Sequence, residues 1–430
     1  MKEKLKIILV ANNDFDGVGQ HVFRINNLLK KKNIDSKILV LHKTKKNPDI
    51  ILLKRSFFLR IRTFLYNFVK KKFNNLFSFD LATVSFKTIN NFIENADVII
   101  FFTLHKIITI NNLSKILEKK KIIYFRPLDL ELATGGCHTN FLESGTMCNN
   151  YKSGCLSCPQ LNKLNYFGIS SQIFKKKYRL FNNFKSRIFV ENKFTKNIYD
   201  SSQIFKKNKT NVIYLGVNKT RVKKLKKQVA RRELKLGLKN KDIILLFASF
   251  NLDAKYKGSE ELLRALSLLN GNSYFQEKIK SKKIKIITVG RRNNFVINIP
   301  NIKWLHLGLV KSDKTLNLLY RAADVLLCPS INDNGPHIVS EAIQNNLPVI
   351  AFNQGIAKET IINNKNGYLI PCYNVEKYAA AINNIIFLKN RLKEDFNTRK
   401  IKMKFNPSNE INSILNFIKK DKKNYSIYED

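Results

Sequence analysis

The chain has 430 residues, 44% of them hydrophobic, and a formal net charge of +45. A chain of this length is too long to fold around one hydrophobic core of ordinary size, so we expect two domains. The positive charge attracts phosphate-bearing partners, but lysine is spread along the whole sequence. No zinc-finger spacing, basic zipper or aromatic ribonucleoprotein motif occurs. This disfavours nucleic acid as the partner and leaves a basic nucleic-acid-binding protein as the alternative function.

The first apolar run, residues 6–11, is too short for a signal peptide. No stretch approaches the ~20 apolar residues that cross a bilayer. We therefore expect a cytoplasmic protein. Six cysteines in a chain of this length do not suggest a secreted disulfide scaffold, and four of them fall between residues 137 and 158.

Apolar runs typical of strands buried on both faces recur through the first half of the chain. They cover residues 6–11, 36–42, 96–104, 120–128 and 187–192. A helical pattern follows the first of them, and the spacing between the others leaves room for helices. Residues 1–205 are therefore predicted to form an open, mostly parallel α/β sheet.

Residues 51–79 interrupt this pattern, because they are basic and apolar together. The predicted helix has one apolar stripe, formed by Phe57, Ile61, Phe64, Leu65 and Phe68. Such a helix can lie in the headgroup region of an anionic membrane. The alternative is a helical insertion packed on the domain, with its arginines and lysines in water. The membrane hypothesis would place the protein on the inner face of the plasma membrane.

The strand pattern restarts in the second half of the chain. The predicted strands are residues 241–250, 283–290, 301–308, 323–330, 347–353 and 367–372. Residues 206–400 are therefore predicted to form a second doubly wound domain. Residues 401–430 are expected to form a terminal helix or tail.

The stretch SINDNGPHIVSEAI places Asp333 and Glu341 eight positions apart, after one predicted strand and inside the following helix. That helix is expected to start near His337, where its unpaired N–H groups suit a diphosphate. Asp333 is then a candidate acceptor for sugar hydroxyls, and Glu341 for a pair of ribose hydroxyls. The alternative is an ordinary helix preceded by an acidic capping residue.

Around this stretch, LYRAADVLLCPSINDNGPHIVSEAIQNNLPVIAFNQG resembles the donor-site core of the family 4 glycosyltransferases. YKGSEELLRAL resembles the family's Lys-Gly segment, and DGVGQHVFRI resembles its first Gly-rich loop. The resemblance implies the GT-B fold, in which two Rossmann-like doubly wound domains face each other across a cleft. It also implies a retaining enzyme that uses a nucleotide-sugar, UDP- or GDP-linked, and needs no cofactor or catalytic metal ion.

Carried over position by position, the resemblance gives each matching residue a role. Asp333 would contact the donor sugar, Glu341 the ribose and Lys257 the phosphates. Backbone N–H groups of Asn334, Gly335 and His337 would face the sugar and phosphate. Gly17 and Gly19 would allow close approach to the donor phosphates or the acceptor.

The chain departs from the family in three places. Its first acid is aspartate instead of glutamate. The arginine ahead of the Lys-Gly segment is missing, and Lys255 or Arg291 is a candidate replacement. A histidine of many relatives is replaced by Leu128, which leaves nearby Arg126 as a candidate positive charge in the donor site.

RPLDLELATGGCHTNFLESGTMCNNYKSGCLSCPQL resembles a subgroup that assembles bacterial surface polysaccharides, including lipopolysaccharide. This implies a glycan acceptor on a membrane lipid diphosphate; a soluble acceptor and an inactive, donor-binding homologue are the alternatives. Within residues 135–160, the spacing of the cysteines suggests a tetrahedral structural zinc site. Its candidate ligands are Cys137, Cys148, Cys155 and Cys158, with His138 as a competing ligand. The alternative is a set of reduced cysteines that support a loop.

Overall fold

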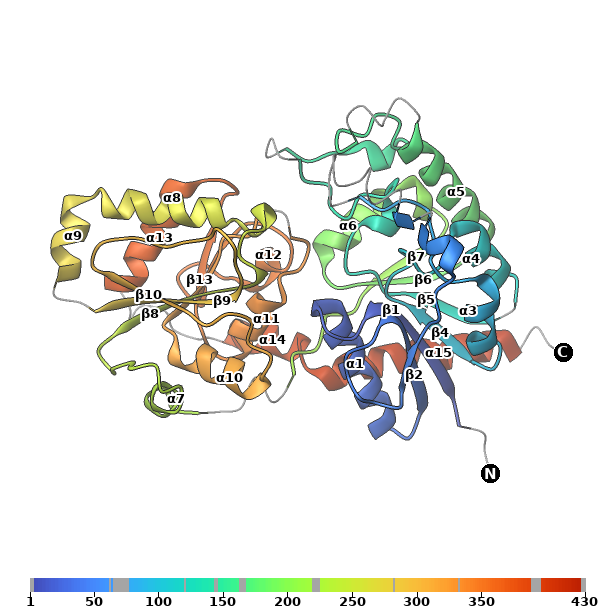
Figure 1. Cartoon of the computed structure of the whole chain (residues 1–430), viewed down its shortest axis with the longest axis horizontal. Coiled ribbons are helices and arrows are strands. Elements are labelled where there is room, and N and C mark those ends of the chain that lie inside the picture. Colours follow the sequence, from blue (N-terminus) through green and yellow to red (C-terminus); the bar gives the residue numbers. More distant parts are fainter. Residues whose placement is uncertain are drawn as a thin grey trace. The chain divides into compact units, whose positions relative to one another are not determined.

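The structure is a computed structural model that describes residues 4–61, 63–64, 77–119, 121–142, 146–161, 168–218, 225–280, 283–331, 333–387 and 396–426. The chain forms two compact units (Figure 1). One comprises residues 1–214 together with 408–430, and the other comprises residues 215–407. Each unit contains a parallel sheet covered by helices, which confirms the predicted α/β fold class.

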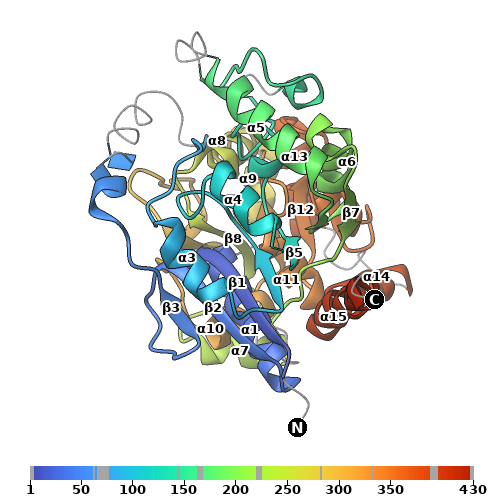
Figure 2. The same cartoon turned by 90° about the vertical axis from the view of Figure 1, so that its right-hand side faces the viewer.

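The sheet of the first unit has seven strands in the described part of the chain, all paired in parallel. Figure 2 shows it from β3 at one edge to β7 at the other. In order across the sheet the strands are β3 (Ile50–Leu52), β2 (Asp35–His42), β1 (Lys6–Asn13), β4 (Val98–Phe101), β5 (Ile122–Phe125), β6 (Arg187–Val190) and β7 (Lys209–Val212). Every residue of β4 and β5 is buried, which explains their continuous apolar sequences.

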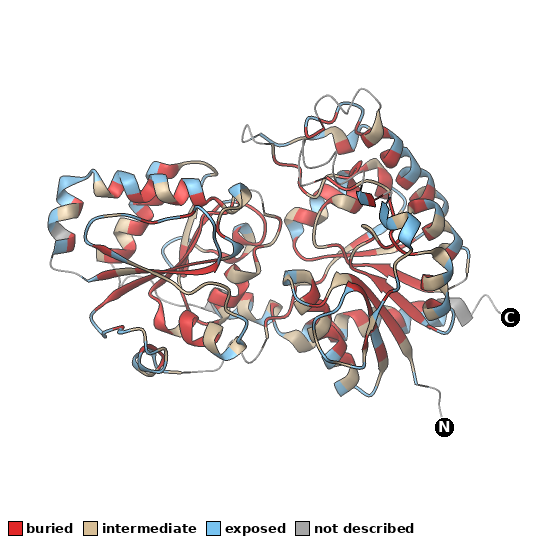
Figure 3. Ribbon diagram, viewed as in Figure 1, coloured by how far each residue is buried: buried red, intermediate tan, exposed pale blue. Residues whose placement is uncertain are grey.

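Helices bury both faces of this sheet. On one face, α1 (Gly17–Lys31) and α15 (Pro407–Ser426) share a hydrophobic core with the strands. On the other face the core includes α3 (Phe86–Ile93), α4 (Ile110–Leu117) and α5 (Ile169–Asn183). Figure 3 shows the resulting pattern, with helices buried on one side and exposed on the other. The α6 helix (Lys193–Ser201) precedes the last strand.

The second unit has a six-stranded parallel sheet in the described residues. Its strands, in order, are β10 (Ile302–His306), β9 (Ile284–Arg291), β8 (Ile243–Asn251), β11 (Val325–Cys328), β12 (Val349–Phe352) and β13 (Gly367–Ile370). Its α-helices are α7 (Lys227–Glu233), α8 (Ser259–Asn270), α9 (Ser273–Lys280), α10 (Asp313–Ala322), α11 (His337–Gln344), α12 (Ala357–Thr360), α13 (Val375–Phe387) and α14 (Phe396–Lys404). One face of the sheet packs on α8, α9 and α13. All six strands were predicted.

The interrupting segment, residues 51–79, is partly integrated into the first unit. Ile51 and Leu52 belong to β3, which pairs with β2, and Phe77 is buried in the core. Residues 57–61 are helical, as predicted, with exposed Phe57 and Ile61. Leu65 and Phe68 lie outside the described residues. The prediction of one continuous amphipathic segment is therefore wrong at both of its ends.

The boundary between the two units lies after Tyr214, whereas the sequence predicts it at 205/206. The difference arises because β7 pairs with β6 and therefore belongs to the first sheet. The expected tail is also divided. α14 ends within the second unit, whereas α15 packs against the first sheet through Ile411, Ile414 and Ile418. None of the helices described here is both long enough and apolar enough to span a membrane.

Candidate functional site

The residues predicted to hold a donor lie at the carboxyl ends of adjacent strands in the second unit. β8 and β11 are neighbours, and the order of the strands reverses between them. The segment after β8 contains Lys257, and the loop after β11 contains Asp333. In open α/β sheets, this reversal point is where ligands bind, outside the carboxyl ends of the strands. The topology therefore places both residues at the expected position for a ligand.

The structure brings Lys257 and Asp333 into contact. The Lys257 ammonium forms an ion pair with Asp333 Oδ2 and lies 5.1 Å from the centre of the Tyr256 ring. Burial alone would lower the pKa of Lys257, but the Asp333 carboxylate raises it above its usual value. Lys257 is therefore protonated at neutral pH, and its charge is available to an anion that displaces the carboxylate.

The backbone conformation at Gly258 explains why a glycine follows Lys257. It adopts a left-handed conformation, with φ of +73°, and a Cβ atom built there would lie 1.6 Å from the carbonyl oxygen of Pro329. No other residue fits this close approach between the turn after β8 and the end of β11. The turn can therefore place Lys257 directly against the Asp333 loop.

The Asp333 loop is supported by the segment after β12. Gln354 Nε2 donates a hydrogen bond to Ser330 O, and Asn334 is buried. A Cβ atom on Gly355 would lie 2.6 Å from Asp333 O, so the two backbones touch. Gly335 N–H donates to Asp333 Oδ1 at 3.3 Å. These contacts hold the Asp333 loop against the segment after β12.

The α11 helix begins at His337, as predicted, and Pro336 at its N-cap makes no side-chain capping hydrogen bond. Asp333 instead bonds within its own loop and to Lys257. The alternative that Asp333 is an ordinary acidic cap is therefore wrong. The helix start carries a partial positive charge next to the loop.

Glu341 is buried, with 5% of its surface exposed, and its Oε2 accepts a hydrogen bond of 2.6 Å from the Tyr320 hydroxyl. Tyr320 is on α10, and no motif in the sequence points to it. The bond fixes the orientation of the carboxylate that is predicted to bind ribose. That role for Glu341 stays a prediction.

Tyr320→Phe tests how strongly this carboxylate is held. The change keeps the ring and removes one donor to a buried charge, so we expect a loss of about 1.5–3 kcal/mol in unfolding free energy. Tyr378→Phe is the matched control, because the buried Tyr378 donates to the neutral Ile350 O at 3.0 Å; it should cost about 0.5–1.5 kcal/mol. Urea unfolding followed by Trp304 fluorescence reports this unit, since the chain has a single tryptophan. Equal losses would contradict the assigned role of Tyr320.

The two candidate replacements for the missing arginine are exposed at the same edge of the sheet. Arg291 ends β9, with its guanidinium 4.9 Å from the centre of the Phe250 ring. Lys255 lies in the single 3-10 turn that also contains Lys257. The structure leaves both as candidates.

In the first unit, Gly17 and Gly19 begin α1 directly after β1, again where the strand order reverses. A Cβ atom on Gly19 would lie 2.3 Å from Asn13 O, and the Gly19 N–H is capped by Asp16 at 2.8 Å. Gly19 is therefore required for packing. A Cβ on Gly17 would meet nothing within 4 Å, so its backbone faces open space and stays the candidate for ligand contact.

Arg126 does not belong to a donor site. It is fully buried in the first unit, where its guanidinium pairs with Glu410 of α15 and donates to Ile213 O at 3.2 Å. His21 Nε2 lies 3.0 Å from the same Glu410 carboxylate. Arg126 was predicted to contribute charge to the site, but that charge is neutralised inside the core.

Two Rossmann-like units in one chain, of which the second carries a lysine and carboxylates at its strand-order reversal, define a GT-B glycosyltransferase fold. Residues 230–403 match the model of the family "Glycosyl transferases group 1". This match lies within the second unit, which contains the candidate donor residues.

Individual proteins are similar to the chain as well. Spore coat protein SA of Bacillus subtilis (strain 168) is 30% identical over an alignment of 205 residues. The match covers 42% of this chain and half the length of that relative. Sucrose-phosphate synthase from Thermosynechococcus elongatus has the same fold, with a TM-score of 0.68 and 15% identity over 97% of this chain and 99% of that one. HepE of Anabaena, solved with UDP-glucose, has a TM-score of 0.65 and 13% identity over 97% and 100%.

Proposed function

We propose that the chain transfers a sugar from a nucleotide diphosphate sugar, UDP- or GDP-linked, to a glycan acceptor. The contact between Lys257 and Asp333 carries this proposal, because it joins a cation and a carboxylate at the ligand-binding edge of the second sheet. The solved complex of HepE with UDP-glucose supports a donor of this class.

Lys257 and the start of α11 would act on the diphosphate. An arriving diphosphate competes with Asp333 for the lysine ammonium and releases this carboxylate to accept hydrogen bonds from the donor sugar. As the bond between sugar and phosphate breaks, negative charge grows on the departing phosphate. A fixed ammonium and helix N–H dipoles stabilise that charge more in the transition state than in the bound donor, which accelerates the reaction.

The transfer would retain the anomeric configuration, as the resemblance to family 4 enzymes implies. The donor phosphate itself would then receive the proton of the acceptor hydroxyl. We assign the acceptor to a glycan on a lipid diphosphate, in the assembly of a bacterial surface polysaccharide. The net charge of +45 and the exposed Phe57, Phe58 and Phe64 suit an anionic membrane surface at which such an acceptor would be met.

A thermal-shift screen against UDP-, GDP- and ADP-sugars tests the donor. A ligand at 100 times its Kd that binds only the folded state adds about 2.7 kcal/mol of stability. We expect one nucleotide series to raise the unfolding temperature of the wild type and not that of Glu341→Ala. The screen would contradict the proposal if no nucleotide-sugar raised it while RNA or DNA bound tightly and with a steep salt dependence.

A further inference from the structure

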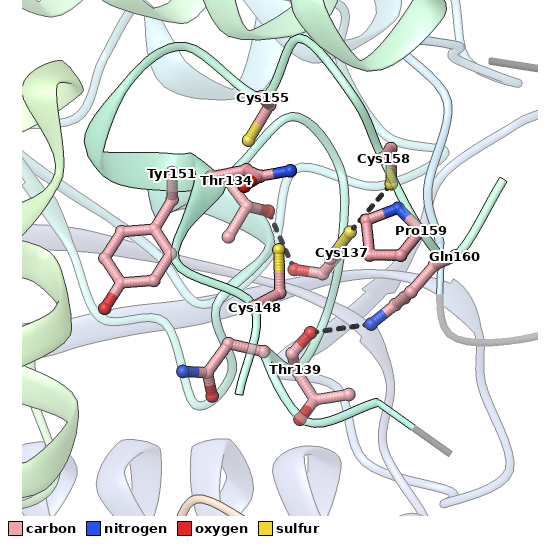
Figure 4. Close-up of a pocket in the computed structure, with 11 residues that line it drawn as sticks. Thr134, Cys137, Thr139, Cys148, Tyr151, Cys155, Cys158, Pro159 and Gln160 are labelled. Atoms are coloured by element: carbon pink, nitrogen blue, oxygen red, sulfur yellow. Dashed lines mark hydrogen bonds between the residues drawn. The ribbon is translucent and has the colours of Figure 1, made fainter. Parts of the chain in front are cut away.

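We propose that Cys137, Cys148, Cys155 and Cys158 bind one structural zinc ion as a tetrathiolate site. All four line one small cavity, of about 20 Å³, in the first unit. Figure 4 shows their sulfur atoms around this space. A site of this volume accommodates one water-sized ligand. The inference concerns residues outside the proposed donor site and does not depend on it.

The separation of two sulfur atoms matches shared coordination. Cys137 Sγ and Cys158 Sγ lie 3.7 Å apart. A disulfide requires about 2.05 Å, so the two are not bonded to each other. Four sulfurs at about 2.3 Å from a tetrahedral zinc ion lie about 3.8 Å from one another. Cys137 and Cys158 therefore already have the spacing of two ligands of the same ion.

Backbone N–H groups lie near three of the four sulfurs, those of Cys148, Cys155 and Cys158. Such donors stabilise negative charge on sulfur, which four thiolates around one zinc ion require. The Gly135 N–H donates a hydrogen bond of 3.3 Å to Cys155 Sγ. The backbone N–H groups of Asn150, Gln160 and Leu161 lie near the sulfurs of Cys148 and Cys158. The N–H groups beside Cys158, a sulfur that already has the spacing of a ligand, would stay next to the bound metal–sulfur cluster.

The competing ligand, His138, is engaged elsewhere. Its Nδ1 lies 2.7 Å from Asp129 Oδ2, and its Nε2 lies 2.6 Å from Ser78 Oγ. Both ring nitrogens therefore have polar partners other than the cysteines. This leaves sulfur as the only ligand type assigned to the site.

Zinc binding requires a local rearrangement. In the part of the chain that the structure describes, no three metal-binding side chains are already grouped closely enough to hold an ion. The sulfurs of Cys148 and Cys155 would have to approach the Cys137–Cys158 pair when the metal binds. Four S–H bonds would break and four Zn–S bonds would form, with release of up to four protons and no change of oxidation state.

The loop also has a structural need for such a link. Between β5 and α5, the described residues contain two single-turn 3-10 helices, Glu131–Ala133 and Asn150–Lys152, and no strand of the sheet. A metal that joins Cys137 to Cys158 would hold together a segment that consists mainly of turns and isolated bridges. Structural zinc sites commonly stabilise loops of this kind.

Metal analysis of the full chain, purified with a reducing agent and without chelator, tests the inference. We expect about one zinc ion per chain by plasma mass spectrometry and a loss of most of it in Cys148→Ser and Cys155→Ser. Cys372→Ser, in the second unit, is the control and should keep its zinc. Removal of zinc by a chelator should lower the thermal midpoint, and added Zn²⁺ should restore it.

Cobalt provides a second measurement if the serine variants fail to fold. Wild-type chain loaded with Co²⁺ should show the intense sulfur-to-cobalt charge-transfer absorption and strong visible bands of a tetrahedral tetrathiolate. Folded chain that binds neither metal and keeps all six cysteines as free thiols, or that contains a Cys137–Cys158 disulfide without metal, would overturn the proposal. Loss of zinc in Cys372→Ser would show that the ligands are misassigned.

Discussion

Lys257→Ala is expected to reduce the rate of sugar transfer about 100- to 1,000-fold, the usual effect of removing one preorganised group that stabilises developing negative charge. The loss should fall mainly on kcat, because the ammonium interacts most strongly with the diphosphate as it departs. Steady-state kinetics with the nucleotide-sugar found by the thermal-shift screen measures both constants. The ion pair with Asp333 is lost as well, but both side chains are partly exposed, so the variant should stay folded.

Lys227→Ala is the matched control for this experiment. Lys227 pairs with Asp324 at 2.8 Å, directly before the amino end of β11. Asp324 keeps Arg231 as a partner at 2.9 Å after the change. The control therefore removes a lysine from an ion pair at the opposite edge of the same sheet, and its kcat should match the wild type. An equal loss in both variants would mean that the effect of Lys257 is on folding.

Glu410→Ala is expected to destabilise the first unit by about 3–5 kcal/mol, the usual result of removing one partner of a buried ion pair. It leaves the fully buried Arg126 without its carboxylate partner, and His21 loses the same partner. Urea unfolding followed by circular dichroism measures the loss. Trp304 fluorescence follows the second unit separately.

Two further variants separate unpaired charge from lost packing. Lys422→Ala changes an exposed residue of the same helix and should alter stability by at most about 0.5 kcal/mol. The double variant Arg126→Met with Glu410→Met removes both charges and keeps apolar volume, so it should be more stable than Glu410→Ala. If it is equally unstable, the buried charge does not explain the cost.

Strands inside the sheets could be predicted from the sequence, because burial on both faces leaves continuous apolar runs such as VIIF in β4. The first unit's edge strand β7 lacks this signal, and the apolar edge strand β3 is too short to show it. β7 has the sequence KTNV, with only Thr210 buried, and β3 has only three residues. An edge strand pairs with only one other strand and is less buried, so it does not need an apolar sequence. The domain boundary was placed too early for this reason.

The sequence predicts those parts of the candidate site that consist of residues close to one another along the chain. Asp333, the helix start at His337 and the Lys-Gly pair belong to short local patterns. Tyr320 lies 21 positions from Glu341, and no local rule pairs a tyrosine of one helix with a glutamate of the next.

Arg126 shows the same limit over a longer range. Its partner Glu410 is 284 positions away, on a helix that returns to the first unit after the second is complete. From the sequence alone, a buried arginine beside a strand end could not be told from one that binds a phosphate.

Amide hydrogen exchange with and without the nucleotide-sugar tests the location of the donor most directly. Bound donor should slow exchange in peptides that cover residues 254–259 and 333–341, where the turn with Lys257, the Asp333 loop and the start of α11 would contact it. Unchanged exchange in both segments at saturating donor, with protection confined to other parts of the chain, would contradict the assignment of this edge of the second sheet as the donor site.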